Sequence, residues 1–179
     1  MKLSLPIVLL FLCVSMASYA QRYRLVAGNV TFFSDAPMED IEAENTEISS
    51  LFDVGTGVAV YKVKISGFQF EKSLMQEHFN EKYLESDKYP ESTFRGRIRG
   101  YDPQLSEWQQ ARAEGDLKIH GVTREIAVDG QVKFSGDRMQ LKATFPVKLE
   151  DYKIKIPKVV FYNIAEVVKV TLDFSYEKE

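Results

Sequence analysis

The chain has 179 residues, of which 45% are hydrophobic and 27% charged, so it can bury one core and is neither collagen-like nor a disordered polar chain. Its 23 Lys and Arg against 26 Asp and Glu give a formal net charge of -3. That balance disfavours nucleic acid as a partner, because nucleic-acid binders normally carry a basic excess. A single cysteine excludes an internal disulfide and a paired-cysteine metal or redox motif.

Residues 1–20 have the features of a cleaved signal peptide. Lys2 supplies a positive start, an apolar run follows, and Ser18 and Ala20 place small residues where signal peptidase inspects the chain. The apolar run is shorter than the ~20 residues that span a bilayer, which disfavours a membrane anchor. We therefore expect cleavage after Ala20 and a single domain over residues 21–179 that is periplasmic or otherwise exported.

Alternation with a period of two dominates the rest of the chain. Between residues 93 and 100 the basic residues share one parity, whereas Phe94 and Ile98 share the other with two glycines. This pattern is typical of half-buried antiparallel strands. We predict about eight strands, over residues 23–33, 41–53, 57–65, 93–100, 111–119, 124–134, 138–149 and 168–176. The parity continues through Asp129-Gly130, so we expect that strand to be unbroken.

Two segments interrupt the β pattern. Residues 73–84 carry apolar residues at helical spacing, and Ser73 with Gln76 fits a capping box, which predicts a short helix inserted between strands. Residues 151–163 contain Pro157 and are expected to form a loop with a strand or a helical turn.

Eight antiparallel strands must hide their edges, and closure into a barrel does so completely. A sandwich is the alternative. A membrane-spanning barrel is excluded because its outer face must be apolar. Here one face carries Arg95, Arg97, Arg99, Arg112, Lys118 and Lys133.

The inward face combines small residues with apolar ones. The small residues are Ala59, Gly96, Gly100, Ala111, Ala113, Gly115 and Ala143. Interiors pack densely, so a face that is too small to fill itself suggests an apolar ligand. Alternatively, Gly and Ala in strands mark sharp coiling or close packing. The predicted lining residues are Ala59, Tyr61, Val63, Phe79, Tyr83, Phe94, Ile98, Ala111, Ala113, Leu117, Ile126, Val128, Leu141, Ala143, Val170, Leu172 and Phe174. Phe79 and Tyr83 would reach the cavity from the helix, or else only pin the helix to the sheet.

The chain lacks the residue sets that metal and nucleophile chemistry require. His78 and His120 are the only histidines, and Cys13 is lost with the signal peptide, so no zinc ligand set remains. The sequence contains no GxSxG motif of hydrolases, no HExxH motif of zinc proteases and no phosphate-binding loop motif. Tyrosines are the only inward titratable groups that we predict. We therefore predict no enzyme activity, no catalytic residue, no metal and no cofactor.

Two stretches resemble the YceI-like family. The first comprises residues 68–75, 79–90 and 93–96, and the second is Gly115-Asp116-Leu117-Lys118-Ile119-His120-Gly121-Val122-Thr123-Arg124. The resemblance implies an exported, all-β, lipocalin-like antiparallel barrel. Its apolar interior would hold a polyisoprenoid or a similar long lipid, and no catalytic residues would be present.

We therefore expect an exported lipid-binding protein that sequesters or carries an apolar, polyisoprenoid-like ligand without inserting into the membrane. A second hypothesis is a structural or stress-response interaction protein, whose filled barrel would have bulky side chains beside Ala113 and Ala143. A lipid hydrolase or lyase ranks last, since it needs a titratable pair facing the interior. The oligomeric state stays open, with a homodimer as one alternative.

Overall fold

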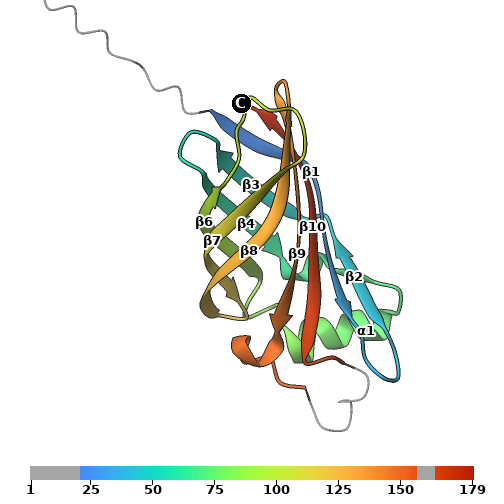
Figure 1. Ribbon diagram of the computed structural model, residues 1–179. Coiled ribbons are helices and arrows are strands. Elements are labelled where there is room, and N and C mark those ends of the chain that lie inside the picture. Colours follow the sequence, from blue (N-terminus) through green and yellow to red (C-terminus); the bar gives the residue numbers. More distant parts are fainter. Residues whose placement is uncertain (1–20, 157–163) are drawn as a thin grey trace, which may run out of the picture.

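A computed structural model describes residues 21–156 and 164–179 of the protein (Figure 1). The expected signal peptide lies outside the described residues, as does the part of the second irregular segment that contains Pro157. The strands are β1 (Arg22–Ser34), β2 (Ile41–Asn45), β3 (Ile48–Asp53), β4 (Val58–Lys64), β5 (Gln69–Phe70), β6 (Glu91–Arg99), β7 (Gln109–Ile119), β8 (Val122–Ser135), β9 (Arg138–Lys148) and β10 (Val167–Lys178). The helical elements are η1 (Ile65–Gly67), α1 (Ser73–His78), η2 (Phe79–Tyr83) and η3 (Leu149–Tyr152).

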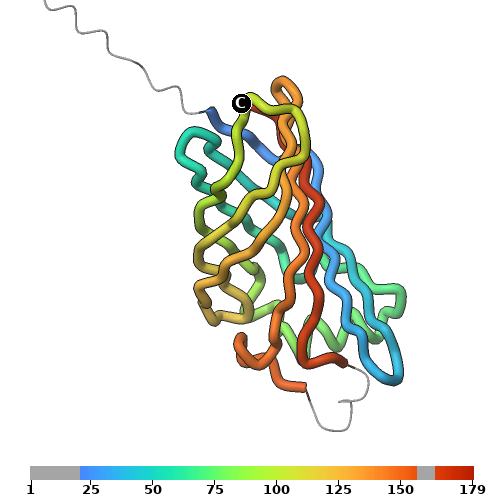
Figure 2. Tube along the Cα trace, viewed as in Figure 1, coloured from blue at the N-terminus to red at the C-terminus, as the bar shows by residue number. Residues whose placement is uncertain are grey.

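The sheet closes on itself. Its strand order is β10-β9-β8-β7-β6-β4-β3-β1, with β2 and β5 beyond β1, and β10 also pairs with β1. The closing ladder runs from Tyr23 opposite Lys178 to Phe33 opposite Lys169. The start of β1 and the end of β10 meet there, where the Glu179 amide donates to the Arg22 carbonyl at 2.9 Å (Figure 2). The prediction of an eight-stranded antiparallel barrel with an inserted helix is confirmed, and the sandwich alternative is wrong.

The predicted strand over residues 41–53 is two strands, β2 and β3. The Asn45 side chain accepts a hydrogen bond from the Glu47 amide and donates one to the Lys64 carbonyl, both at 2.7 Å. This local turn replaces ladder bonds, as Asn side chains commonly do. Both strands nevertheless keep the same register along β1, in which Val30 faces Asn45 and Arg24 faces Leu51. The other seven predicted strands correspond to observed strands, and β8 runs unbroken through Asp129-Gly130 as predicted.

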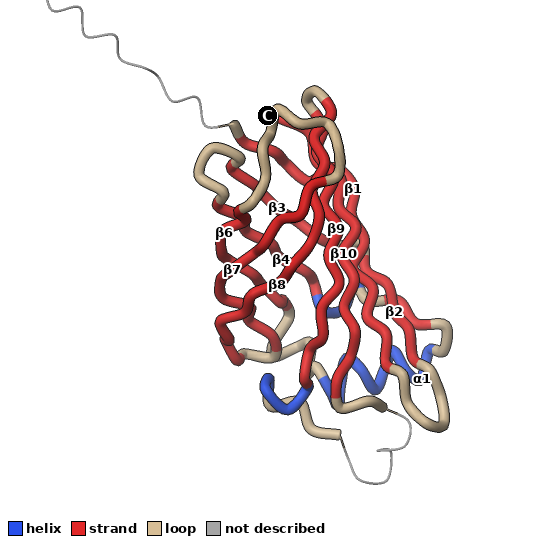
Figure 3. Tube along the Cα trace, in the orientation of Figure 1, coloured by secondary structure: helices blue, strands red, loops and turns tan. Residues whose placement is uncertain are grey.

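The inserted helix begins at Ser73 as predicted, but the capping box is wrong. The N-terminal cap is Lys72, and no side chain caps the helix. The Gln76 side chain instead accepts a hydrogen bond from the Phe70 amide at 3.4 Å, which ties the helix to β5. Beyond His78 the chain continues as the wider π-helical turn η2. These elements lie across one end of the barrel, called here the helix end (Figure 3).

The opposite end is filled by the protein's own side chains. The rings of Phe52 and Tyr101 lie 5.6 Å apart, as do those of Tyr101 and Phe134, and Tyr23 contacts Phe134 edge-on at 6.1 Å. The Tyr101 hydroxyl donates to the Val54 carbonyl at 2.8 Å. We name this cluster the aromatic plug, and its members are Tyr23, Phe52, Tyr101, Phe134, Met139 and Tyr176. The aromatic plug fills this end of the barrel interior.

Candidate functional site

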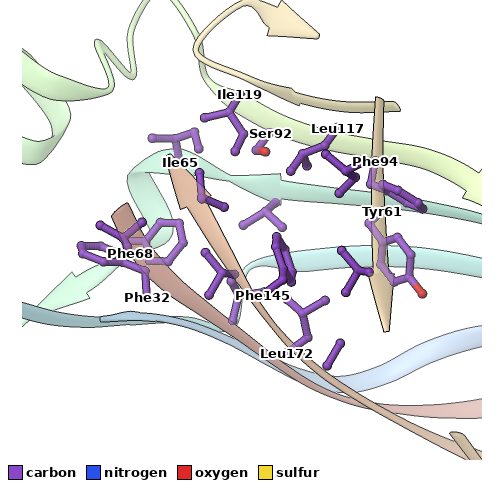
Figure 4. A pocket seen from close by; sticks show the side chains of 18 of the residues that line it. Phe32, Tyr61, Ile65, Phe68, Ser92, Phe94, Leu117, Ile119, Phe145 and Leu172 are labelled. Carbon is purple, nitrogen blue, oxygen red and sulfur yellow. The ribbon is translucent and has the colours of Figure 1, made fainter. Parts of the chain in front are cut away.

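Between the aromatic plug and the helix end the barrel encloses a cavity of about 340 Å³. Its wall is almost entirely apolar, because the strands alternate and turn their charged residues outward. On β6, for example, Phe94 and Ile98 are buried whereas Arg95 and Arg97 are exposed. Figure 4 shows Tyr61 and Phe94 toward one end of the cavity, Phe32 and Phe68 toward the other, and Leu172 between them. The volume falls in the range of ~300–1,000 Å³ that small-molecule pockets occupy.

Sixteen of the seventeen residues predicted to line the cavity lie in its wall. Ala59 does not. It is fully buried between Phe52 and Gly96, its partners on β3 and β6, beside the aromatic plug. The residues that the structure brings together are Tyr61, Val63, Phe79, Tyr83, Phe94, Ile98, Ala111, Ala113, Leu117, Ile126, Val128, Leu141, Ala143, Val170, Leu172 and Phe174. Their role in ligand binding stays a prediction.

Only some of the small inward residues create space. Ala111, Ala113 and Ala143 line the cavity. Gly96 of β6 and Gly115 of β7 face each other. A Cβ added at Gly96 would lie 2.3 Å from the Glu114 carbonyl oxygen, and one added at Gly115 would lie 2.4 Å from the Arg95 carbonyl oxygen. These glycines therefore serve close strand approach. Gly100 follows β6 with a φ of +88°, where it turns the chain. The prediction that these three glycines leave room is wrong.

Four phenylalanines line the cavity at the helix end. Phe79 of η2 stacks on Phe32 of β1 at 5.5 Å and contacts Phe68 and Phe70 at 5.4 and 5.0 Å. Phe79 thus both lines the cavity and anchors the helix. The prediction missed Phe32 because β1 carries a bulge between Leu25 and Ala27, which moves the inward parity from odd to even positions.

The sequence prediction also missed lining residues of two kinds. Some, such as Ile65 and Phe68, lie in loops and short elements with no long alternating pattern around them, so only their apolar character could have indicated burial. Others, such as Val132 and Phe145, lie on long strands and share the inward parity of residues that were predicted. The missed lining residues are Val30, Phe32, Ser34, Glu39, Ile41, Ile65, Phe68, Phe70, Met75, His78, Leu84, Ser92, Thr93, Ile119, Gly130, Gln131, Val132, Lys142, Phe145, Val147, Leu149, Ile154, Ile164 and Val168.

Most of the few polar groups in the wall are bonded to the protein. The Ser34 hydroxyl accepts from the Ala165 amide at 2.8 Å, and the Ser92 hydroxyl donates to the Lys118 carbonyl at 2.9 Å. Glu39 is ion-paired with Lys72. Glu39 and His78 nevertheless reach the cavity at the helix end, so the prediction that tyrosines are the only inward titratable groups is wrong.

Tyr61 places a neutral hydroxyl at the boundary with the aromatic plug. Burial raises the pKa of Tyr61 to about 12, and burial raises the pKa of Tyr176 well above its ordinary value. The Tyr176 and Ser50 hydroxyls lie 2.9 Å apart. At neutral pH these phenols are protonated, so they offer hydrogen bonds and not a base.

A closed antiparallel barrel with an inserted helix and an apolar interior is a lipocalin-like barrel. Within that class, the chain belongs to the YceI-like family, whose YceI-like domain model matches residues 16–176. This confirms the resemblance noted in the sequence. No curated protein matches the chain.

Solved structures share the fold at low sequence identity. The polyisoprenoid binding domain from Saccharophagus degradans superposes with a TM-score of 0.75 at 17% identity, covering 88% of this chain and 98% of that one. BcnA of Burkholderia cenocepacia gives 0.70 at 17% identity, with 83% and 95% covered. The YceI protein of Campylobacter jejuni gives 0.57 at 17% identity, with 74% and 81% covered. At these identities the likeness shows the fold.

Two kinds of feature are absent from the described residues. No helix among them has the length and apolar character needed to cross a membrane. In the same ranges, no group of three His, Cys, Asp or Glu side chains is placed to hold a metal ion.

Proposed function

We propose that this protein is an exported lipid-binding protein that holds a long, apolar, polyisoprenoid-like ligand in the barrel cavity and sequesters or carries it without altering it. The observation that carries the proposal is the cavity itself, which lies inside the barrel and is lined almost wholly by apolar side chains. Apolar volume that water cannot hydrate well is the natural site for a hydrocarbon chain.

Two further observations support this ligand class. The chain belongs to the YceI-like family, and one protein of the same fold is named a polyisoprenoid binding domain. Burial of a methylene group stabilises a complex by ~0.8 kcal/mol, so a five-carbon isoprenoid unit contributes roughly 4 kcal/mol before the costs of ordering. A branched tail can therefore be held with few polar contacts.

The volume beside Ala113 and Ala143 separates this proposal from its main rival. A filled barrel would place bulky side chains next to these alanines, whereas both line the cavity. A binding role is also favoured over catalysis, because Tyr61 is neutral at ordinary pH and the Glu39 carboxylate is engaged by Lys72.

Export rests on the sequence of residues 1–20. In its own host, the protein should be recovered outside the cytoplasm, with the mass of a chain that begins at Gln21. Intact-mass measurement of the fractionated protein tests this part of the proposal. Recovery of full-length chain from the cytoplasm alone would overturn export and leave lipid binding to be judged separately.

The binding proposal is tested by a series of polyprenols of increasing length competing against a fluorescent apolar probe. If the tail is the recognised part, affinity should rise with each added unit until the cavity is full and then level off. A matched series of short, water-soluble alcohols should not compete. Equal affinity across all tail lengths, or no displacement at all, would contradict tail burial.

A further inference from the structure

The barrel wall is open on one side, between β8 and β9. These strands pair only from Gly130 opposite Ala143 to Ser135 opposite Arg138. Toward the helix end, β8 remains paired with β7 over residues 122–129, and β9 remains paired with β10 over residues 144–148. The two strands visibly diverge there (Figure 1, Figure 3). We name this opening the side window.

The side window holds a second cavity, of about 330 Å³. This cavity shares five lining residues with the main one, so the same apolar side chains border both cavities. The shared residues are Leu117, Ile126, Val128, Phe145 and Val147. A hydrocarbon chain that left the barrel here would pass between these apolar side chains.

Side-chain hydrogen bonds hold η3 and the turn before β8 in place at the helix end of the side window. Arg124 of β8 donates from Nε to the Asp151 carbonyl of η3 at 3.0 Å. His120, in the turn between β7 and β8, bonds the Tyr152 carbonyl at 3.1 Å and the Glu85 carboxylate at 2.8 Å. Because η3 is held to β8 in this way, the gap is a built feature of the barrel.

The rim of the side window is polar, whereas the five residues that it shares with the main cavity are apolar. Within the part of the chain that the structure describes, the sheet ladder supplies no partner for the facing edges of residues 122–129 and 144–148. Unpaired strand edges present main-chain N–H and C=O groups. Arg124 and Lys148 also border the window, together with Glu125 and Asp151. The hydrogen-bonding strand edges suit the polar end of an amphiphile, and the apolar residues beside them suit its tail.

We infer that the side window is where the ligand enters the barrel and where its polar end comes to rest, with the tail inside the main cavity. This inference builds on the proposed function. It specifies the ligand class as an amphiphile whose head group accepts hydrogen bonds from the strand edges and from Arg124. The apolar residues shared with the main cavity favour this occupant over an added peptide strand, which would use the edges but not the cavity.

The entry route is tested by bridging the window with a cleavable thiol crosslinker, in protein carrying Cys13→Ser so that no other thiol is present. The bridging pair is Ala127→Cys with Pro146→Cys, both exposed on the window's rim. The matched control is Lys133→Cys with Gln140→Cys, on a rung where β8 and β9 are already paired and outside the lining of both cavities. The probe is a fluorescent polyene fatty acid transferred from and to phosphatidylcholine vesicles.

Bridging the window should slow both loading and release at least tenfold, with the equilibrium affinity within twofold of its starting value, and cleavage should restore both rates. The control pair should leave both rates unchanged. Equal rates for the two crosslinked proteins would overturn the entry route. If the unbridged protein fails to bind any apolar probe, the proposed function itself fails and the window inference falls with it.

A fatty acid with a spin label at its head group locates the polar end. We expect paramagnetic broadening of amide signals over residues 124–128 and 145–148, with the signals of α1 unaffected. Broadening at α1 alone would overturn the head-group assignment and leave the strand edges as a site for an added β-strand.

Discussion

The ring of Phe174 on β10 stacks on the ring of Tyr61 on β4, with centroids 5.5 Å apart and planes inclined by 28°. Both residues line the cavity. Beyond them, Tyr176 contacts Phe174 edge-on at 6.3 Å and belongs to the aromatic plug. This pair therefore marks the boundary between the filled and the hollow parts of one barrel, and the two parts should respond differently to substitution.

Removal of a ring from the filled part should destabilise the fold more than removal of a ring from the hollow part. Phe134→Ala deletes a side chain packed between Tyr23 and Tyr101 and should lower the free energy of unfolding by ~3–5 kcal/mol. Phe145→Ala only enlarges an existing space, so its effect should be smaller. Urea unfolding measures both, and equal losses would contradict a cavity beside Phe145.

Filling the hollow should abolish binding without unfolding the protein. Ala113 faces the cavity between Ile98 and Val128 on neighbouring strands. Ala113→Phe should therefore occupy ligand space and reduce the bound fraction of an apolar probe at least tenfold. Thermal unfolding should show a stable protein. Ala27→Phe, at an exposed position on β1, is the control and should bind as the unsubstituted protein does. Unimpaired binding by Ala113→Phe would place the ligand elsewhere.

The buried Tyr61 should make stability fall at high pH. Its folded-state pKa is about 12, against an unfolded value of about 10. Between those values the unfolded chain releases a proton that the folded chain keeps, so the free energy of unfolding decreases as pH rises. For one such group the slope is about 1.4 kcal/mol per pH unit.

Tyr61→Phe isolates this effect, because the other buried tyrosines remain. The difference in stability between the parent protein and the variant should be constant below pH 10 and should move in favour of the variant between pH 10 and 12. Chemical unfolding across this range provides the measurement. A difference that does not change with pH would show that the Tyr61 hydroxyl ionises as freely in the folded barrel as in the unfolded chain.

Close approach of β6 and β7 should make Gly96 intolerant of a side chain. An added Cβ would lie 2.3 Å from the Glu114 carbonyl oxygen, so Gly96→Ala must push the strands apart. We expect a loss of ~1–3 kcal/mol, which is typical of overpacking. Gly55→Ala is the control, since its nearest neighbour would be the Asp53 side chain at 3.5 Å. Differential scanning calorimetry should rank the two variants, and equal melting temperatures would contradict the close contact.

Most of the fold could be predicted from the alternation of apolar and polar residues along the strands. On β6 and β7 the charged and apolar parities match the observed outer and inner faces, because one buried and one wet face impose a period of two. The same rule explains why Ala111 and Leu117 could be placed in the wall. It could not separate Ala113, which borders empty space, from Gly115, whose backbone touches β6, because both are small residues of one parity.

Features that depend on neighbours were not visible in the sequence. Inward parity on β1 changes at the bulge after Leu25, so Phe32 was missed. Ala59 has the pattern of a lining residue, but the aromatic plug next to it takes up the space. The side window was also hidden, since residues 122–129 alternate in the same way whether one or both of their edges are paired. Which strands pair with each other depends on the tertiary structure and not on the alternation within one strand.

The most direct test is native mass spectrometry of the protein purified from its own host, followed by extraction and identification of whatever it carries. We predict a complex whose excess mass matches one amphiphile with a long, apolar, isoprenoid-like tail. Ala113→Phe prepared in the same way should have lost that mass. Recovery of an unliganded protein that also fails to take up added polyprenols would contradict lipid binding as the role of this barrel.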